Sequence, residues 1–125
     1  MISITGTCQG YNTEYRCFQV DITKAEHTRL QAAYSRPDDT YSALTEFVGK
    51  DGKTNYRAKI KVPKERSFSE ALFNQMYFGA YSIINVKRDE YEFMNDGKLM
   101  KGTTFTMISI KPRDRPVAAD QQPMP

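Results

Sequence analysis

Apolar and polar side chains alternate along residues 55–62. The apolar positions are Tyr56, Ala58, Ile60 and Val62, and the polar positions are Asn55, Arg57, Lys59 and Lys61. Successive side chains of a strand point to opposite faces, so the pattern predicts a strand with one apolar face and one cationic face. A cationic face of this kind suits a polyanion. The alternative is a solvated edge strand whose lysines discourage pairing with other chains.

The segment before this strand predicts a β-hairpin. Asp51 and Gly52 form a hairpin turn signal, and Lys50 and Lys53 flank them. Residues 41–48 should form the partner strand. Further strands are expected over residues 2–7, 15–20, 80–86 and 103–110, with another hairpin tip over residues 91–100 around Asp96-Gly97.

Two short helices are predicted between the strands. Thr23 is a suitable N-cap for a helix over residues 24–34, because Glu26 stands three residues on and completes a capping-box pattern. Its inner side would consist of Leu30, Ala33 and Tyr34. Ser67 can cap a second helix that ends at Gly79. The apolar stripe of that helix is Phe68, Leu72, Phe73 and Met76, a spacing more typical of core than of a ligand site.

This order of elements predicts a mainly β chain with two short inserted helices, arranged as a mainly antiparallel sheet or a small barrel. A length of 125 residues suits one domain, which we assign to residues 1–111. Residues 112–125 are rich in proline and offer little to pack, so we expect a disordered tail.

The sequence gives little sign of catalysis or of a metal. It has no Gly-rich phosphate loop and no recognisable nucleophile motif, so we expect a non-enzymatic protein without a cofactor. His27 has no ligand spacing to either cysteine, so no metal site is predicted, and a lone histidine on a polar helix is expected at the surface. Cys8 and Cys17 flank a turn centred on Asn12-Thr13, which permits a disulfide, but reduced, partly buried cysteines are the commoner case in a chain without an export signal.

Neither a long apolar run nor a signal-peptide pattern is present, so we expect no membrane span and a soluble, cytoplasmic protein. The formal net charge is only +3 at pH 7, which permits nucleic-acid binding without requiring it. The positions of the charged residues along the chain are therefore more informative than the net charge.

Aromatic residues lie near basic ones at three places in the chain. Single-stranded nucleic acid requires this pairing, because phosphates need cations and unstacked bases need flat π surfaces. The candidate binding residues are Tyr15, Arg16, Lys50, Lys53, Tyr56, Arg57, Lys59, Lys61, Tyr91, Phe93 and Lys98. Tyr56 is the single best candidate for base stacking by its position near the Gly52 turn, although its parity assigns it to the apolar face. Tyrosine is also a common strand residue, and the alternative is that part of this set serves only to cover the sheet.

Two segments resemble a known family. Residues 49–57, Gly-Lys-Asp-Gly-Lys-Thr-Asn-Tyr-Arg, resemble the basic, glycine-containing DNA-binding wing of the filamentous bacteriophage (inovirus) single-stranded DNA-binding proteins. Residues 79–83, a later glycine-bearing hairpin and residues 107–112 resemble the closing strands of that family. The chain departs from the family's compact pattern by its longer N-terminal half and by both expected helices.

The resemblance implies a five-stranded OB-like barrel, a homodimer and sequence-indifferent coating of single-stranded DNA during phage or plasmid replication. The host bacterial cytoplasm would be its location. It assigns Lys50, Lys53, Tyr56 and Arg57 to the wing, with Phe93 in the later hairpin.

Two other functions remain open. One is a small phage- or plasmid-encoded protein that binds a host protein through the apolar segment 68–78 or through a sheet edge. The other is an RNA-binding module with a similar surface.

Overall fold

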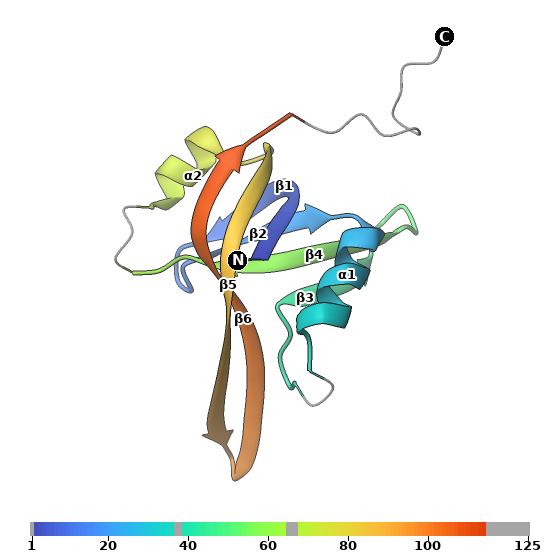
Figure 1. Cartoon of the computed structure of the whole chain (residues 1–125), viewed down its shortest axis with the longest axis vertical. Helices are drawn as coiled ribbons and strands as arrows, with labels where there is room; N and C mark the ends of the chain where they lie inside the picture. Colours follow the sequence, from blue (N-terminus) through green and yellow to red (C-terminus); the bar gives the residue numbers. More distant parts are fainter. Residues whose placement is uncertain (1, 37–38, 65–67, 115–125) are drawn as a thin grey trace.

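The computed structural model describes residues 2–36, 39–64 and 68–114. Within them, the elements follow one another as β1 (Ile2–Asn12), β2 (Cys17–Ile22), α1 (Lys24–Tyr34), β3 (Leu44–Val48), β4 (Thr54–Lys61), α2 (Glu70–Met76), β5 (Tyr81–Asn95) and β6 (Lys98–Pro112) (Figure 1). The tail prediction falls mainly on residues 115–125, which lie outside the described residues. No helix of the described ranges is long and apolar enough to cross a membrane.

Five of these strands close into a barrel in the order β1-β2-β4-β6-β5, with β5 pairing back to β1. The pairing of β4 with β6 is parallel, and the other pairings are antiparallel. Helix α2 lies in the connection between β4 and β5. The arrangement is an OB-like small barrel, so the predicted fold class is confirmed.

Strand β4 is paired along both edges. It meets β2 on one side, and on the other side it meets β3 over residues 54–58 and β6 at Ile60 and Lys61. The interpretation of this segment as a solvated edge strand is therefore wrong. Its predicted faces are confirmed, because Ala58, Ile60 and Val62 are fully buried whereas Lys59 and Lys61 are exposed.

Helix α1 forms over the predicted residues. Thr23 is its N-cap, and the Thr23 hydroxyl accepts a hydrogen bond from the backbone N–H of Glu26 at 3.1 Å. The inner face differs from the prediction: Ala33 is exposed, whereas His27 and Leu30 are buried. The surface position predicted for His27 is wrong, because its three-residue spacing from Leu30 places both on the face that packs on the barrel.

Helix α2 begins later than predicted. Its N-cap is Ser69, whose hydroxyl accepts a hydrogen bond from the N–H of Leu72 at 3.1 Å. Ser67, the predicted cap, lies outside the described residues. Phe73 is fully buried, and Gly79 adopts a φ of 77° after the helix ends, as its role as a terminator predicted.

The two cysteines are buried and unpaired. The β1–β2 turn lies over residues 13–16 and is not centred on Asn12-Thr13 as predicted, so Cys8 faces Val20 and Cys17 faces Asn12. The disulfide that a regular hairpin would permit therefore does not form.

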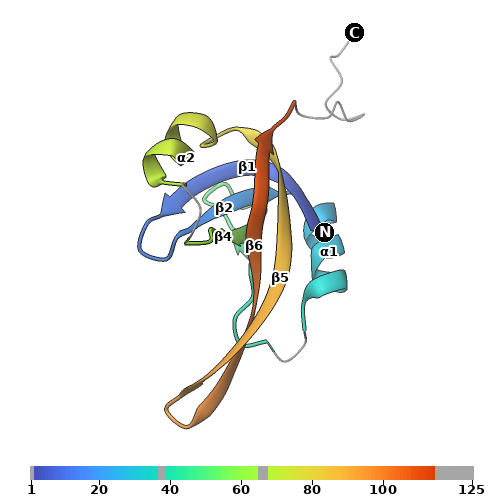
Figure 2. The same ribbon diagram turned by 60° about the vertical axis from the view of Figure 1, so that its left-hand side comes forward.

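Strands β5 and β6 are much longer than predicted. They stay paired from Ser82 and Pro112 to Asn95 and Lys98, and Asp96 and Gly97 make the tip with φ values of 51° and 78°. The predicted turn is confirmed. The far half of this hairpin, residues 89–104, projects away from the barrel in both views, and we call it the arm (Figures 1 and 2).

Candidate nucleic-acid interface

The outer surface of the barrel is continuous from β2 across β4 and β6 to β5. Cys17 is paired with Lys61, Lys61 with Thr106, and Thr106 with Lys87. Directly paired residues present their side chains on the same face of a sheet. These four residues therefore form one row across four strands, and Lys59 lies on the same face two residues from Lys61.

A groove of about 600 Å³ opens on this face, where the arm leaves the barrel. The barrel side of its lining consists of Tyr15, Cys17, Lys59 and Lys61. The arm side consists of Asp89, Glu90, Tyr91, Thr104 and Thr106. The groove thus lies between a lysine pair and an aromatic ring that come from distant parts of the sequence.

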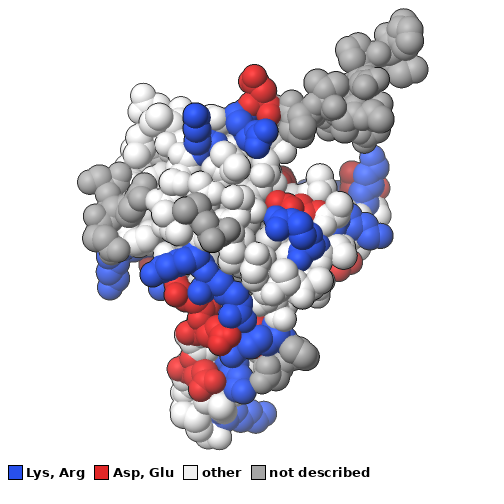
Figure 3. Space-filling view, in the orientation of Figure 1, with Lys and Arg blue, Asp and Glu red and all other residues white. Residues whose placement is uncertain are grey.

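Some charged side chains around the groove form salt bridges and others do not. Among the described residues, no salt bridge joins Lys59 or Lys61 to a carboxylate. The Glu90 carboxylate is held by Arg36 at 3.2 Å and by Arg88 at 2.8 Å. Figure 3 shows basic and acidic side chains side by side where the arm meets the barrel, and largely uncharged atoms at its far end. The lysine pair therefore remains available to an anionic ligand.

Two further groups on the groove lining are a carboxylate and a thiol. Asp89 accepts a hydrogen bond from the Thr106 hydroxyl at 2.9 Å. Burial raises the pKa of the Cys17 thiol and outweighs the opposing effect of Lys59, so the thiol stays protonated at neutral pH.

Aromatic rings extend the groove along the arm. The rings of Tyr91 and Phe93 are nearly parallel, at 10°, with centroids 6.2 Å apart. The Tyr91 ring crosses over Gly102, where an added Cβ would lie 2.1 Å from the Tyr91 Cζ. Burial raises the pKa of Tyr91, with Tyr41 and Asp39 adding to the rise, so the phenol is neutral at physiological pH.

A third ring reaches the arm from the connection between α1 and β3. Tyr41 forms a parallel bridge with Gly102, and its ring lies 6.1 Å from that of Phe93 at an angle of 7°. Sequence reasoning missed Tyr41. The one local signal for it is Gly102 inside a strand, because such a glycine often marks the close approach of another group.

The structure brings together six of the predicted residues. Tyr15, Lys59, Lys61 and Tyr91 line the groove, Phe93 follows along the arm, and Lys98 stands exposed beside the arm tip. Tyr15 is the most exposed of the aromatic residues in this group.

Other predicted residues lie elsewhere. Lys50 and Lys53 are on the β3–β4 turn, at the opposite end of β4 from Lys61. Tyr56 is half-buried, with its ring 4.8 Å from that of His27 on α1, so its surroundings are those of a packing residue.

Two predicted arginines are engaged in structural contacts. Arg57 forms an ion pair with Asp21 at 2.7 Å, and its guanidinium lies 4.8 Å from the centre of the Phe47 ring. Arg16 donates to the carbonyls of Pro63 and Lys64 at 3.4 and 3.3 Å, which ties the β1–β2 turn to the end of β4.

A larger cavity of about 800 Å³ lies between β1 and the start of α1. Its carboxylates are already paired, Glu26 with Arg29 at 2.8 Å and Asp21 with Arg57 at 2.7 Å. Tyr81 contributes a ring and Arg113 a guanidinium to its lining, and none of the described lining residues is a lysine. Its chemistry suits a single strand less well than that of the groove.

No protein-family model matches the chain, and no curated protein matches it either. We therefore infer the function from the geometry of the groove and the arm.

Proposed function

We propose that this protein binds single-stranded DNA in the groove and along the arm, without strong sequence preference and without catalysis. The observation that carries the proposal is the lysine pair, Lys59 and Lys61, facing Tyr91 across one groove. OB folds bind oligonucleotides on the face of their second and third barrel strands, between the first hairpin loop and the last. Here those parts correspond to β2, β4, the β1–β2 turn and the arm.

The chemistry divides between the two sides of the groove. Lys59 and Lys61 would hold phosphates, and the rings of Tyr91 and Phe93 would stack on bases. Stacking needs bases whose faces are free, which favours a single strand over a duplex, and every base has such a face, which explains binding without sequence preference. The phage-family resemblance adds three predictions, a homodimer, a role in phage or plasmid replication and a cytoplasmic location.

The host-protein alternative receives less support. The segment 68–78 that it relies on gives Phe68 and Phe73 to the core, which leaves Met76 and Phe78 as its large exposed apolar side chains. The RNA alternative uses the same groove, so a DNA and an RNA strand of equal length and sequence are compared in the same titration.

A fluorescence-anisotropy titration with labelled oligo-dT of about 16 nucleotides, the upper range of OB-fold site sizes, tests the proposal. Lys59→Ala/Lys61→Ala should weaken binding by roughly tenfold or more, because two phosphate contacts are lost. The matched control is Lys50→Ala/Lys53→Ala, which removes the same charge from the β3–β4 turn and should have a smaller effect. The reverse order would move the site to that turn, as the family resemblance implies. Native protein that binds no oligonucleotide would refute the proposal in favour of the host-protein alternative.

A further inference from the structure

The arm presents three aromatic rings and not two. Tyr41, Phe93 and Tyr91 are 45%, 42% and 38% exposed, respectively. Their neighbouring rings are inclined by 7° and 10°, with centroids 6.1 and 6.2 Å apart. Near-parallel rings direct their faces the same way, so we call these three residues the platform.

Gly102 makes this arrangement sterically possible. It is paired with Tyr91 on β5 and bridged to Tyr41 on its other side. A side chain at this position would enter the space of the Tyr91 side chain, because two ring atoms and the hydroxyl oxygen lie within 2.5 Å of an added Cβ. The position of the Tyr91 ring thus depends on the absence of a side chain at Gly102.

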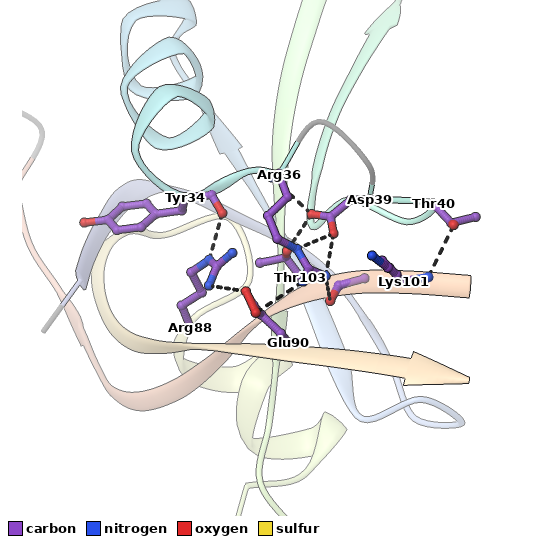
Figure 4. Close-up of polar contacts among 9 residues, drawn as sticks. Tyr34, Arg36, Asp39, Thr40, Arg88, Glu90, Lys101 and Thr103 are labelled. Carbon is purple, nitrogen blue, oxygen red and sulfur yellow. Dashed lines mark hydrogen bonds and ion pairs between the residues drawn. The ribbon is translucent and has the colours of Figure 1, made fainter. Parts of the chain in front are cut away.

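The connection that carries Tyr41 is fixed to the base of the arm (Figure 4). The Asp39 carboxylate accepts hydrogen bonds from the Thr103 hydroxyl at 2.6 Å and from the Arg36 Nε at 2.8 Å. Arg36 also contacts Glu90 at 3.2 Å, and Glu90 contacts Arg88 at 2.8 Å. We call these five residues the clamp.

Backbone contacts join the connection to the arm next to the clamp. The N–H groups of Thr40 and Tyr41 both donate to the Lys101 carbonyl, at 2.8 and 3.0 Å. The Lys101 N–H in turn donates to the Thr40 hydroxyl at 3.3 Å (Figure 4). Tyr41 therefore follows directly on a segment whose position the clamp and these bonds set.

The clamp lies on the opposite face of the arm from the platform. Thr103 is paired with Glu90, one position along from the pair of Gly102 and Tyr91. Successive strand residues point to opposite faces, so Thr103 and Glu90 face away from the platform. The Asp39 side chain is only 5% exposed. A ligand on the platform would not touch Asp39 or Thr103, whereas Glu90 also lines the groove at the base of the arm.

We propose that Tyr41 is a third base-stacking residue of this site, and that Asp39 and Thr103 are positioning residues that hold it there. The inference rests on the proposed function. With three rings, the site would bind a stretch of single strand that has enough unstacked bases to cover all three. It also predicts that two residues remote from the ligand control affinity.

The direct test is Tyr41→Leu, which keeps apolar bulk but removes the aromatic face. Affinity for oligo-dT should fall by roughly 5- to 150-fold, the fold-change that corresponds to about 1–3 kcal/mol per stacked base. Tyr41→Phe should bind like the native protein. The slope of log affinity against log salt should stay unchanged, because no phosphate contact is lost. Phe78→Ala, which removes an exposed ring after α2, is the matched control and should bind normally.

A double-mutant cycle tests the positioning role. Thr103→Val should weaken binding in the native background and have no further effect in the Tyr41→Leu background, because its effect acts through that ring. Melting curves of each variant confirm that the titrated protein is folded. Additive effects would show that Thr103 does not act through Tyr41 and would overturn the positioning role. If Tyr41→Leu bound with native affinity while Lys59→Ala/Lys61→Ala remained impaired, Tyr41 would not be a third stacking residue. The proposed function would still stand.

Discussion

The salt dependence of binding provides the most quantitative check on the groove. Lys59 and Lys61 are exposed, point to the same face of β4, and stand about 7 Å apart along the strand at about 3.3 Å per residue. Neither is joined to a carboxylate by a salt bridge in the described part of the chain. Each is therefore free to neutralise one phosphate and to release the counterion associated with it.

Counterion release sets the expected magnitude. Each phosphate contact to a single strand contributes about −0.7 to the slope of log affinity against log salt, so removing two contacts should make the slope shallower by about 1.4. Between about 50 and 200 mM salt, the native protein should then lose roughly sevenfold more affinity than Lys59→Ala/Lys61→Ala. Exposed charges contribute little to folding, so the variant should keep its native melting temperature.

The assay is the oligo-dT titration repeated at four or more salt concentrations, for the native protein, the Lys59→Ala/Lys61→Ala variant and the Lys50→Ala/Lys53→Ala control. The control should keep the native slope, because the groove lysines are intact. Equal slopes for the native protein and the groove variant would refute the assignment of phosphates to this lysine pair, even if the variant bound more weakly.

Three other changes probe the core, the arm and the clamp. Ile60→Ala should lower the free energy of unfolding by about 2–5 kcal/mol in a urea titration, since the side chain is fully buried, and near-native stability would mean that the faces of β4 are reversed. Gly102→Ala should cost about 1–3 kcal/mol by displacing Tyr91 and should also weaken oligo-dT binding. Gly10→Ala, where an added Cβ meets nothing within 4 Å, is its control, and equal effects of the two changes would contradict the steric argument. Burial alone would raise the pKa of Asp39, but hydrogen bonds from its hydroxyl and guanidinium partners lower it below its ordinary value. Its contribution to stability is therefore complete above the unfolded carboxyl pKa of about 3.9 and is lost as pH falls through the lower folded value, so the difference in melting temperature between native protein and Asp39→Asn should shrink only in that acidic range.

Local patterns in the sequence predicted the local structure well. The alternation around Ile60 identified both faces of β4, Thr23 identified the start of α1, and Asp96-Gly97 identified the tip of the arm. Each of these signals acts between residues a few positions apart. The period of a strand, the first unpaired N–H groups of a helix and the positive φ of a turn are all readable at that range.

The contacts that assemble the site are of another kind. Tyr41 meets Phe93, and Lys61 pairs with Thr106, across long stretches of intervening chain. A parallel pairing between β4 and β6 leaves no turn signal to read, because the two strands are not joined by a hairpin. His27 was misjudged for the same reason, since its burial depends on which face of α1 meets the barrel. Parity correctly assigned Tyr56 to the inner face, and the structure gives it a neighbour on α1 there.

The arm is a two-stranded hairpin, and contacts on both of its faces stabilise it. A two-stranded hairpin without a third strand is only marginally stable in water, so a binding surface built on one would have to be ordered by its ligand. On one face the clamp joins the arm to the connection before β3, where Asp39, Thr103 and Glu90 have their polar groups paired (Figure 4). On the other face the Tyr91 ring covers Gly102 and packs beside the other two rings of the platform. Because the rings already pack beside one another, binding would lose less conformational entropy than it would on a free hairpin. The alternation of a strand thus separates the residues that fix the arm from those that would meet the bases.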